Sequence, residues 1–162
     1  DRYTLQNAAT EELINRYGSN LAEKFKHVTY ILPHGTYRNG GENWYAYGYV
    51  NAYLSVFNDE EITFVSTAVH EIGHNLGLQH SNFQGRSYRD TSGYMGLSYA
   101  DTNGPLMCFN AAKSWSIGWF DDKKVEIDPT KMKRPWKGEL VSFVDYPRAD
   151  PASGQYIIIK VD

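Results

Sequence analysis

Three histidines and one glutamate lie within residues 70–80 of this 162-residue sequence, which reads HEIGHNLGLQH there. On a helix, His70 and His74 are four residues apart, so their imidazoles can converge on one ion. His80 is six residues further on, and Gly77 can adopt the left-handed conformation that ends a helix and turns the chain back. Three neutral imidazoles with one open coordination position are typical of catalytic zinc. The sequence therefore predicts one catalytic Zn²⁺ held by His70, His74 and His80.

Glu71 follows the first of these histidines and should point to the side of the ion rather than at it. A general base that takes a proton from water and passes it to a leaving amine belongs in that position. Two other interpretations of the cluster are possible. A chance cluster of histidines is disfavoured, because the full spacing should arise on the order of 10⁻⁵ times per chain. A zinc-stabilised but catalytically inactive protein-binding module stays open as the second hypothesis.

The spacing of apolar residues predicts the elements that position these side chains, and together they indicate an α+β fold. We expect the active-site helix to start from Asn58 as N-cap and to run to about Leu76, with an apolar stripe formed by Val65, Val69, Ile72 and Leu76. Other predicted helices cover about 5–25 and 110–119, and predicted strands cover about 27–33, 44–58 (one strand or two), 124–128, 139–146 and 155–161.

Composition limits the possible functions. The net charge of −3 comes from interleaved acids and bases, so no basic stripe favours nucleic acid, and no apolar run is long enough for a membrane span. The single cysteine, Cys108, forms no internal disulfide and is interpreted as a small buried hydrophobe. We expect a monomeric single domain, 1–162, that is a processed piece of a longer chain.

The eleven-residue motif matches the metzincin zinc-protease signature H-E-x-x-H-x-x-G-x-x-H at every fixed position. Three further segments, YRDTSGYMG (88–96), CFNAAKSWSIGWF (108–120) and LVSFVDYPRA (140–149), resemble the gametolysin (autolysin) group, and the resemblance covers about residues 28–160. It implies a secreted zinc endopeptidase, made as a zymogen, that cleaves extended polypeptide or glycoprotein substrates of a cell wall or matrix. The implied fold is a twisted mixed β-sheet with an active-site helix and a smaller C-terminal part, divided at about 1–80 and 81–162.

The metzincin resemblance also implies a methionine-containing turn beneath the zinc. Met95 in GYMG is the favoured candidate and Met107 in PLMC the alternative, while either could be an ordinary core residue. Some metzincins carry a catalytic tyrosine two residues after that methionine, where this sequence has Leu97; its nearest tyrosines are Tyr94 and Tyr99.

Two regions of the sequence allow two interpretations each. The strand region Trp44 to Phe57 either pairs with an extended substrate or is an ordinary core strand. Residues 101–104 form either a plain turn or a weak calcium loop.

Overall fold

The structure, a computed structural model, describes residues 1–38, 40–96 and 107–162. The described chain forms two compact units, Asp1–Asn110 and Ala111–Asp162, and each is treated by itself. The single domain with a division near residue 80 stays a prediction. Leu97, Tyr99 and residues 101–104 lie outside the described residues. None of the described helices is long and apolar enough to cross a membrane.

The first unit is built around a mixed three-stranded sheet in the order β1-β3-β2. β1 (Val28–Leu32) runs parallel to β3 (Leu54–Asn58), with Val28 opposite Leu54. β2 (Ala46–Gly48) runs antiparallel to β3, with Ala46 opposite Phe57. The predicted strand region 44–58 is therefore two strands, of which β3 is central and β2 lies at the edge. A mixed sheet agrees with the predicted α+β class.

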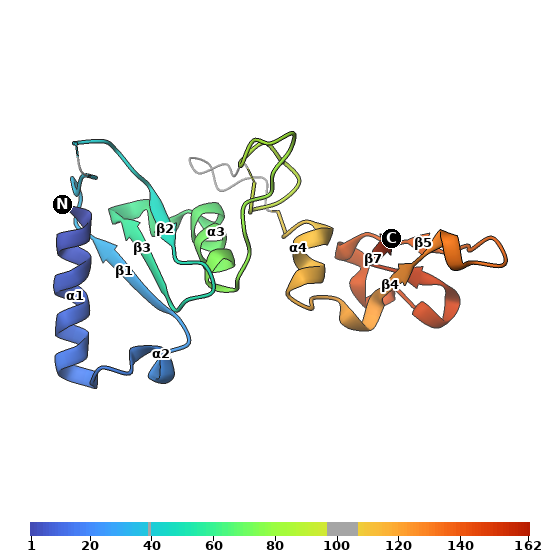
Figure 1. The fold of residues 1–162 in the computed structure, drawn as a ribbon, viewed down its shortest axis with the longest axis horizontal. Coiled ribbons are helices and arrows are strands. Elements are labelled where there is room, and N and C mark those ends of the chain that lie inside the picture. The colour runs from blue at the N-terminus through green and yellow to red at the C-terminus, as the bar shows by residue number, and fades with distance from the viewer. Residues whose placement is uncertain (39, 97–106) are drawn as a thin grey trace. The chain divides into compact units, whose positions relative to one another are not determined.

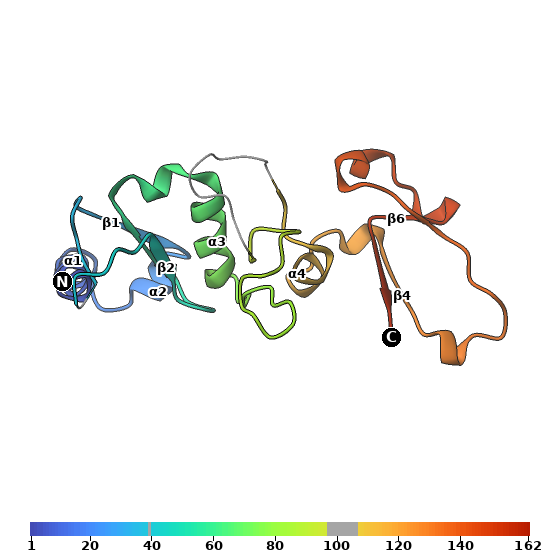
Figure 2. The same cartoon turned by 90° about the horizontal axis from the view of Figure 1, so that it is seen from above.

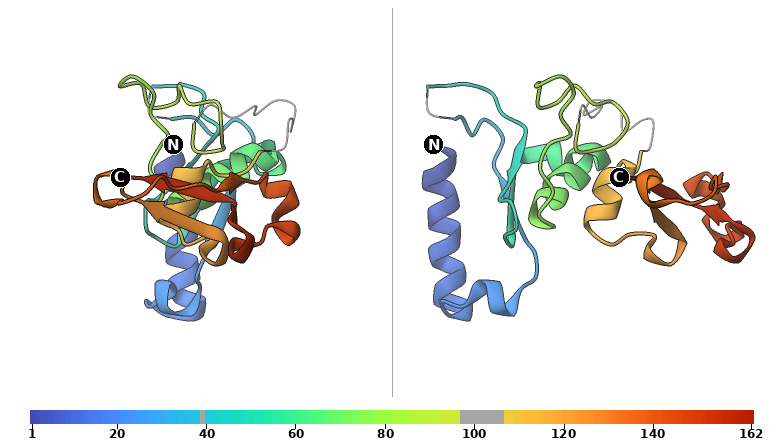
Figure 3. Two further views of the ribbon diagram at one scale, coloured as in Figure 1. Left: turned by 90° about the vertical axis from the view of Figure 1, so that its right-hand side faces the viewer. Right: turned by 45° about the vertical axis from the view of Figure 1, so that its right-hand side comes forward.

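This sheet lies between α1 (Arg2–Tyr17) and α3 (Val65–Asn75), as the ribbon shows (Figure 1, Figure 2 and the right-hand view of Figure 3). Alternate residues of β3 serve the two faces. Leu54 and Val56 join a buried core with Tyr30, Leu32 and Trp44, against which Ala9 and Leu13 of α1 pack. Ser55 instead faces α3, where its hydroxyl donates to the Asn75 side chain.

The predicted helix over residues 5–25 is interrupted. α1 ends at Tyr17, because Gly18 has a φ of +85° that no helix continues, and a single further turn forms α2 (Leu21–Lys24). At the other end, the carboxylate of Asp1 caps the helix by accepting the backbone N–H of Tyr3 at 2.7 Å.

The start of the active-site helix also differs from the prediction. Asp59–Thr63 forms the 3-10 turn η1, Phe64 is extended, and α3 begins only at Val65. Asn58 makes no capping bond, and its amide nitrogen donates to the carbonyl of Trp44.

The predicted apolar stripe of α3 is not its buried face. Val65, Ile72 and Leu76 are each about two-fifths exposed. The buried side chains are the mostly polar ones on the opposite face: Ser66, Thr67, His70, Glu71, His74 and Asn75. Periodicity alone fails here because hydrogen bonds to the sheet and to following loops make burial of this polar face possible.

The second unit consists of short elements. They are α4 (Ala111–Ser116), β4 (Lys124–Ile127), β5 (Glu139–Leu140), β6 (Gln155–Tyr156), β7 (Ile158–Val161) and the 3-10 turns η2 (Asp121–Lys123), η3 (Pro129–Lys131), η4 (Phe143–Arg148) and η5 (Pro151–Ser153). β4 pairs with β7 and β5 with β6, both parallel. The predicted strand 139–146 is wrong beyond Leu140, where the chain turns into η4 around Pro147.

Candidate metal centre

The end of α3 brings His80 back toward the helix. Gly77 has a φ of +89°, which confirms the predicted left-handed turn. Its N–H donates to the carbonyl of His74 at 2.8 Å, and the N–H of Leu78 donates to Gly73 at 3.0 Å. These two bonds are those of the Schellman motif, which satisfies the last carbonyls of a helix while reversing the chain. Leu78, 3% exposed, anchors the reversed chain.

The three histidines form one cluster. Their ring centroids are 4.9 Å apart for His70 and His74, 4.8 Å for His74 and His80, and 5.2 Å for His70 and His80. One ligand atom of each lies within 4.8 Å of those of the other two. The Nε2 atoms of His74 and His80 are 3.1 Å apart. Tetrahedral zinc with bonds of about 2.0 Å holds its ligand atoms about 3.3 Å apart, so the cluster is compatible with zinc.

Backbone carbonyls orient two of the rings. Nδ1 of His70 lies 2.5 Å from the carbonyl oxygen of Tyr94, and Nδ1 of His74 lies 2.8 Å from that of Leu78. An imidazole that donates from Nδ1 to a carbonyl presents Nε2 as the lone-pair nitrogen, which is the usual arrangement around a bound metal. Burial lowers the pKa of His70 to about 4, so its ring is neutral at pH 7 and able to bind a cation.

Glu71 is buried beside the cluster. Burial raises the pKa of its carboxyl to about 7, while a hydrogen bond from the backbone of Gly48 acts in the opposite direction. A carboxyl with a pKa near 7 can both accept and return a proton at neutral pH.

The residue beneath the helix is Met95. Its side chain is fully buried and packs against Gly73, where a β-carbon would collide with the methionine sulfur. Its carbonyl accepts the N–H of Ser81 at 2.6 Å, which ties this segment to the residue after His80. Met107 is half-buried, and its N–H donates to the Tyr94 hydroxyl. Of the two methionines considered from sequence, Met95 is therefore the one that contacts the active-site helix.

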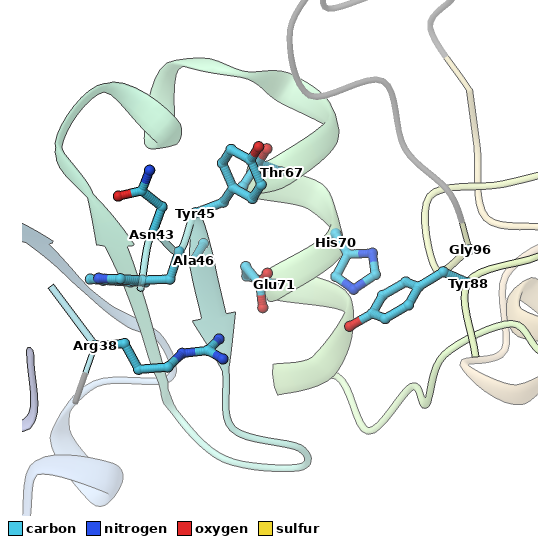
Figure 4. A pocket seen from close by; sticks show the side chains of 10 residues that line it. Arg38, Asn43, Tyr45, Ala46, Thr67, His70, Glu71, Tyr88 and Gly96 are labelled. Atoms are coloured by element: carbon cyan, nitrogen blue, oxygen red, sulfur yellow. The ribbon is translucent and has the colours of Figure 1, made fainter. Parts of the chain in front are cut away.

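A pocket of about 470 Å³ opens beside His70 and Glu71. It is lined by Arg38, Asn43, Trp44, Tyr45, Ala46, Thr67, His70, Glu71, Tyr88 and Gly96. Figure 4 shows the carboxylate of Glu71 between the Arg38 side chain on one side and His70 with Tyr88 on the other. The ring centroid of Tyr88 lies 4.1 Å from that of His80 and 6.0 Å from that of His70.

Sequence reasoning missed Tyr88, Arg38 and Asn75. Asn75 fastens α3 to the sheet: its amide nitrogen donates to the carbonyls of Tyr49 and Leu54, and its oxygen accepts the Ser55 hydroxyl. Tyr88 opens the segment YRDTSGYMG, but only the fold places it over His80. Arg38 carried no signal, because its proximity depends on the loop that precedes β2.

The other titratable residues weighed from sequence lie apart from the cluster. His34 is exposed and contacts Asp59 at 3.1 Å, and His27 is also exposed. Cys108, predicted to be a small buried hydrophobe, is only half-buried, and burial raises the pKa of its thiol, which disfavours a nucleophilic thiolate.

Comparison with known proteins identifies the class. The family model described as gametolysin peptidase M11 matches residues 2–144, so the match begins before the predicted resemblance of about 28–160 and ends before it. The chain belongs to this family of metallopeptidases, which confirms the gametolysin resemblance and makes the protein a peptidase whose substrate is a polypeptide. No curated protein and no solved structure matches the chain significantly.

Proposed function

We propose that the protein is a zinc-dependent endopeptidase in which His70, His74 and His80 hold one Zn²⁺ and Glu71 is the general base. The observation that carries the proposal is the convergence of three imidazoles, two of them oriented through Nδ1, at the edge of a pocket that also contains a buried carboxyl group. When bound, zinc supplies Lewis acidity, which polarises a peptide carbonyl and lowers the pKa of water.

Glu71 then handles the proton. Its carboxylate accepts the proton of the attacking water and returns it to the nitrogen of the leaving amine, so that no net proton is consumed. The contact with the Gly48 backbone fixes this carboxyl relative to the edge strand. The same close approach explains Gly48, because a β-carbon there would collide with the backbone carbonyl of Glu71.

The edge strand β2 is a possible pairing site for the backbone of an extended substrate. Among the residues that the structure describes, β2 pairs only with β3, and Trp44, Tyr45 and Ala46 line the pocket at Glu71. We propose that a substrate peptide pairs with β2 through its backbone, which would place a peptide bond beside Glu71 and leave side-chain selection to the pocket. From membership of the gametolysin family we further propose a secreted enzyme, made as a zymogen, whose substrates are extracellular proteins such as cell-wall or matrix glycoproteins. A separate proposal concerns the residue that packs on the active-site helix: we propose that Met95 forms the methionine-containing turn beneath the zinc.

The test is a digest of a peptide library and of casein by the zinc-loaded protein. We expect cleavage that 1,10-phenanthroline abolishes and that added zinc restores, with internal cleavage sites identified by mass spectrometry. The alternative of a non-catalytic zinc module predicts intact peptides at every zinc concentration, so absence of cleavage by protein with one bound zinc would contradict our proposal. Release of terminal residues only would contradict the assignment as an endopeptidase.

A further inference from the structure

A second pocket lies in the Ala111–Asp162 unit. It is a groove of about 440 Å³ lined by Ile127, Pro129, Met132, Lys133, Arg134, Pro135 and Trp136. One wall is formed by Met132 to Trp136, which belong to the segment KMKRPWK (131–137), and this segment has four cations and no acid in seven residues. The groove thus combines an indole ring with positive charge, and the peptidase site uses none of these residues.

The aromatic wall is held in place by its neighbours. Trp136 is half-buried and its ring lies against Gly138, where any β-carbon would collide with the six-membered ring of the indole. The ring centroid of Tyr156 in β6 is 5.9 Å from that of Trp136. Because Gly138 and Tyr156 restrict the indole, a ligand that stacks on it loses little side-chain entropy.

Both ends of the segment are also anchored. Asp128 caps η3 by accepting the N–H of Thr130 at 2.9 Å. After Gly138, β5 pairs with β6, with Glu139 opposite Gln155. The groove is therefore a formed surface between two fixed points of the chain.

The cations differ in how they are compensated. Lys131 is paired with Asp128 at 2.7 Å. Lys133, Arg134 and Lys137 are exposed and form no ion pair with any residue that the structure describes. The two nearest acids in sequence are engaged elsewhere, Asp128 with Lys131 and Glu139 with the amide of Gln155. Two of these cations, Lys133 and Arg134, therefore line the groove together with the indole of Trp136, and Lys137 follows Trp136 in the sequence.

We propose that this groove binds an anionic oligosaccharide, that is, a glycan carrying sulfate or carboxylate groups. The C–H face of a pyranose ring is apolar and suits the electron-rich face of an indole. Arg134 can hold a sulfate or carboxylate through two parallel hydrogen bonds, and Lys133 and Lys137 add point charges. The groove volume lies within the range of small-ligand sites and accommodates a short stretch of sugar rings.

Two other anionic partners fit the groove less well. A membrane surface is met by protruding apolar side chains with basic neighbours, whereas Trp136 lies half-buried along a groove. A nucleic acid is attracted by an extended basic surface, whereas this chain has a net charge of −3 and the basic segment at the groove covers only residues 131–137. The anionic glycan is thus the ligand that uses both the indole and the local charge. This binding site goes beyond the proposed peptidase function and does not depend on it.

The experiment measures binding of a sulfated heparin-derived hexasaccharide to the whole protein by isothermal titration calorimetry. The charge variant is Lys133→Ser with Arg134→Ser, and the stacking variant is Trp136→Ala. Each is expected to weaken binding about tenfold, because each removes a charge-assisted or aromatic contact. Lys131→Ser is the control from the same segment and is expected to change the affinity less than twofold, since Lys131 does not line the groove and its exposed ion pair with Asp128 contributes little. Circular dichroism melting verifies the fold, and the exposed Lys133 and Arg134 provide a test even if Trp136→Ala unfolds.

Further ligands give the remaining outcomes. Binding should fall with added salt, and a neutral maltohexaose should bind at least tenfold more weakly. Equal binding of maltohexaose would overturn the role of charge. Unchanged affinity in the Lys133 and Arg134 variant would overturn the location. Vesicles containing phosphatidylserine and a single-stranded oligonucleotide are tested in the same way. If either binds more tightly than the hexasaccharide, and if the same variants weaken that binding, the proposal of a glycan ligand is wrong and that partner replaces it.

Discussion

The hydrogen bonds at Nδ1 of His70 and His74 set the direction in which each ring can bind a metal. Both acceptors are backbone carbonyls, of Tyr94 and Leu78, so the orientation follows from the path of the chain after the helix. The motif predicted which side chains converge, because its spacings are local geometry. It could not predict Tyr88 and Arg38, since each reaches the pocket from a loop that only the fold places there.

The two methionines provide a test of single side chains. Met95→Leu should weaken zinc binding and lower stability by about 1 kcal/mol, because its fully buried sulfur packs on Gly73 between the two helical histidines. Met107→Leu should change neither quantity measurably, since only its backbone N–H contacts the Tyr94 hydroxyl. Competition with a chromogenic chelator and a urea melt measure the two effects. If Met107→Leu weakens zinc binding and Met95→Leu does not, the proposed turn is assigned to the wrong methionine.

The active-site helix is fastened to the sheet by polar contacts rather than by an apolar stripe. Gly77 and the approximate end of α3 were predictable, because a positive-φ glycine after a run of helical residues is a local signal. The buried polar face was not predictable. It depends on Ser55 and on carbonyls of the sheet, which only the three-dimensional arrangement brings next to Asn75.

Asn75 offers a graded test of this attachment. Asn75→Ala should destabilise the protein by about 1–3 kcal/mol, because the carbonyl of Leu54 and the hydroxyl of Ser55 lose a buried partner. Asn75→Asp should cost more, since a carboxylate cannot donate to the two carbonyls that the amide contacts. Urea unfolding measures the stability of the three proteins, which we expect to decrease in the order wild type, Asn75→Ala, Asn75→Asp. An aspartate variant as stable as the wild type would show that these bonds do not hold the helix.

At the scale of the whole molecule, the candidate site belongs to one of the two units. The Asp1–Asn110 unit contains the histidine cluster, Glu71 and the pocket beside them. The α+β class and the gametolysin family were predictable, because both depend on short segments whose residues act locally. The short strands of the second unit were less predictable from the sequence. Residues 139–146 alternate well enough to suggest one strand, but with the turns of η4 and Pro147 the strand β5 covers only Glu139–Leu140.

The most direct test of the account compares Glu71→Gln with the wild type, both zinc-loaded, for zinc content by native mass spectrometry and for peptide turnover. Glutamine keeps the size of the side chain but cannot accept the proton, and the three histidines are unchanged. We predict one zinc ion in each protein and a loss of turnover of about 10²–10⁴-fold in the variant. A Glu71→Gln protein with undiminished turnover would contradict the assignment of Glu71 as the general base.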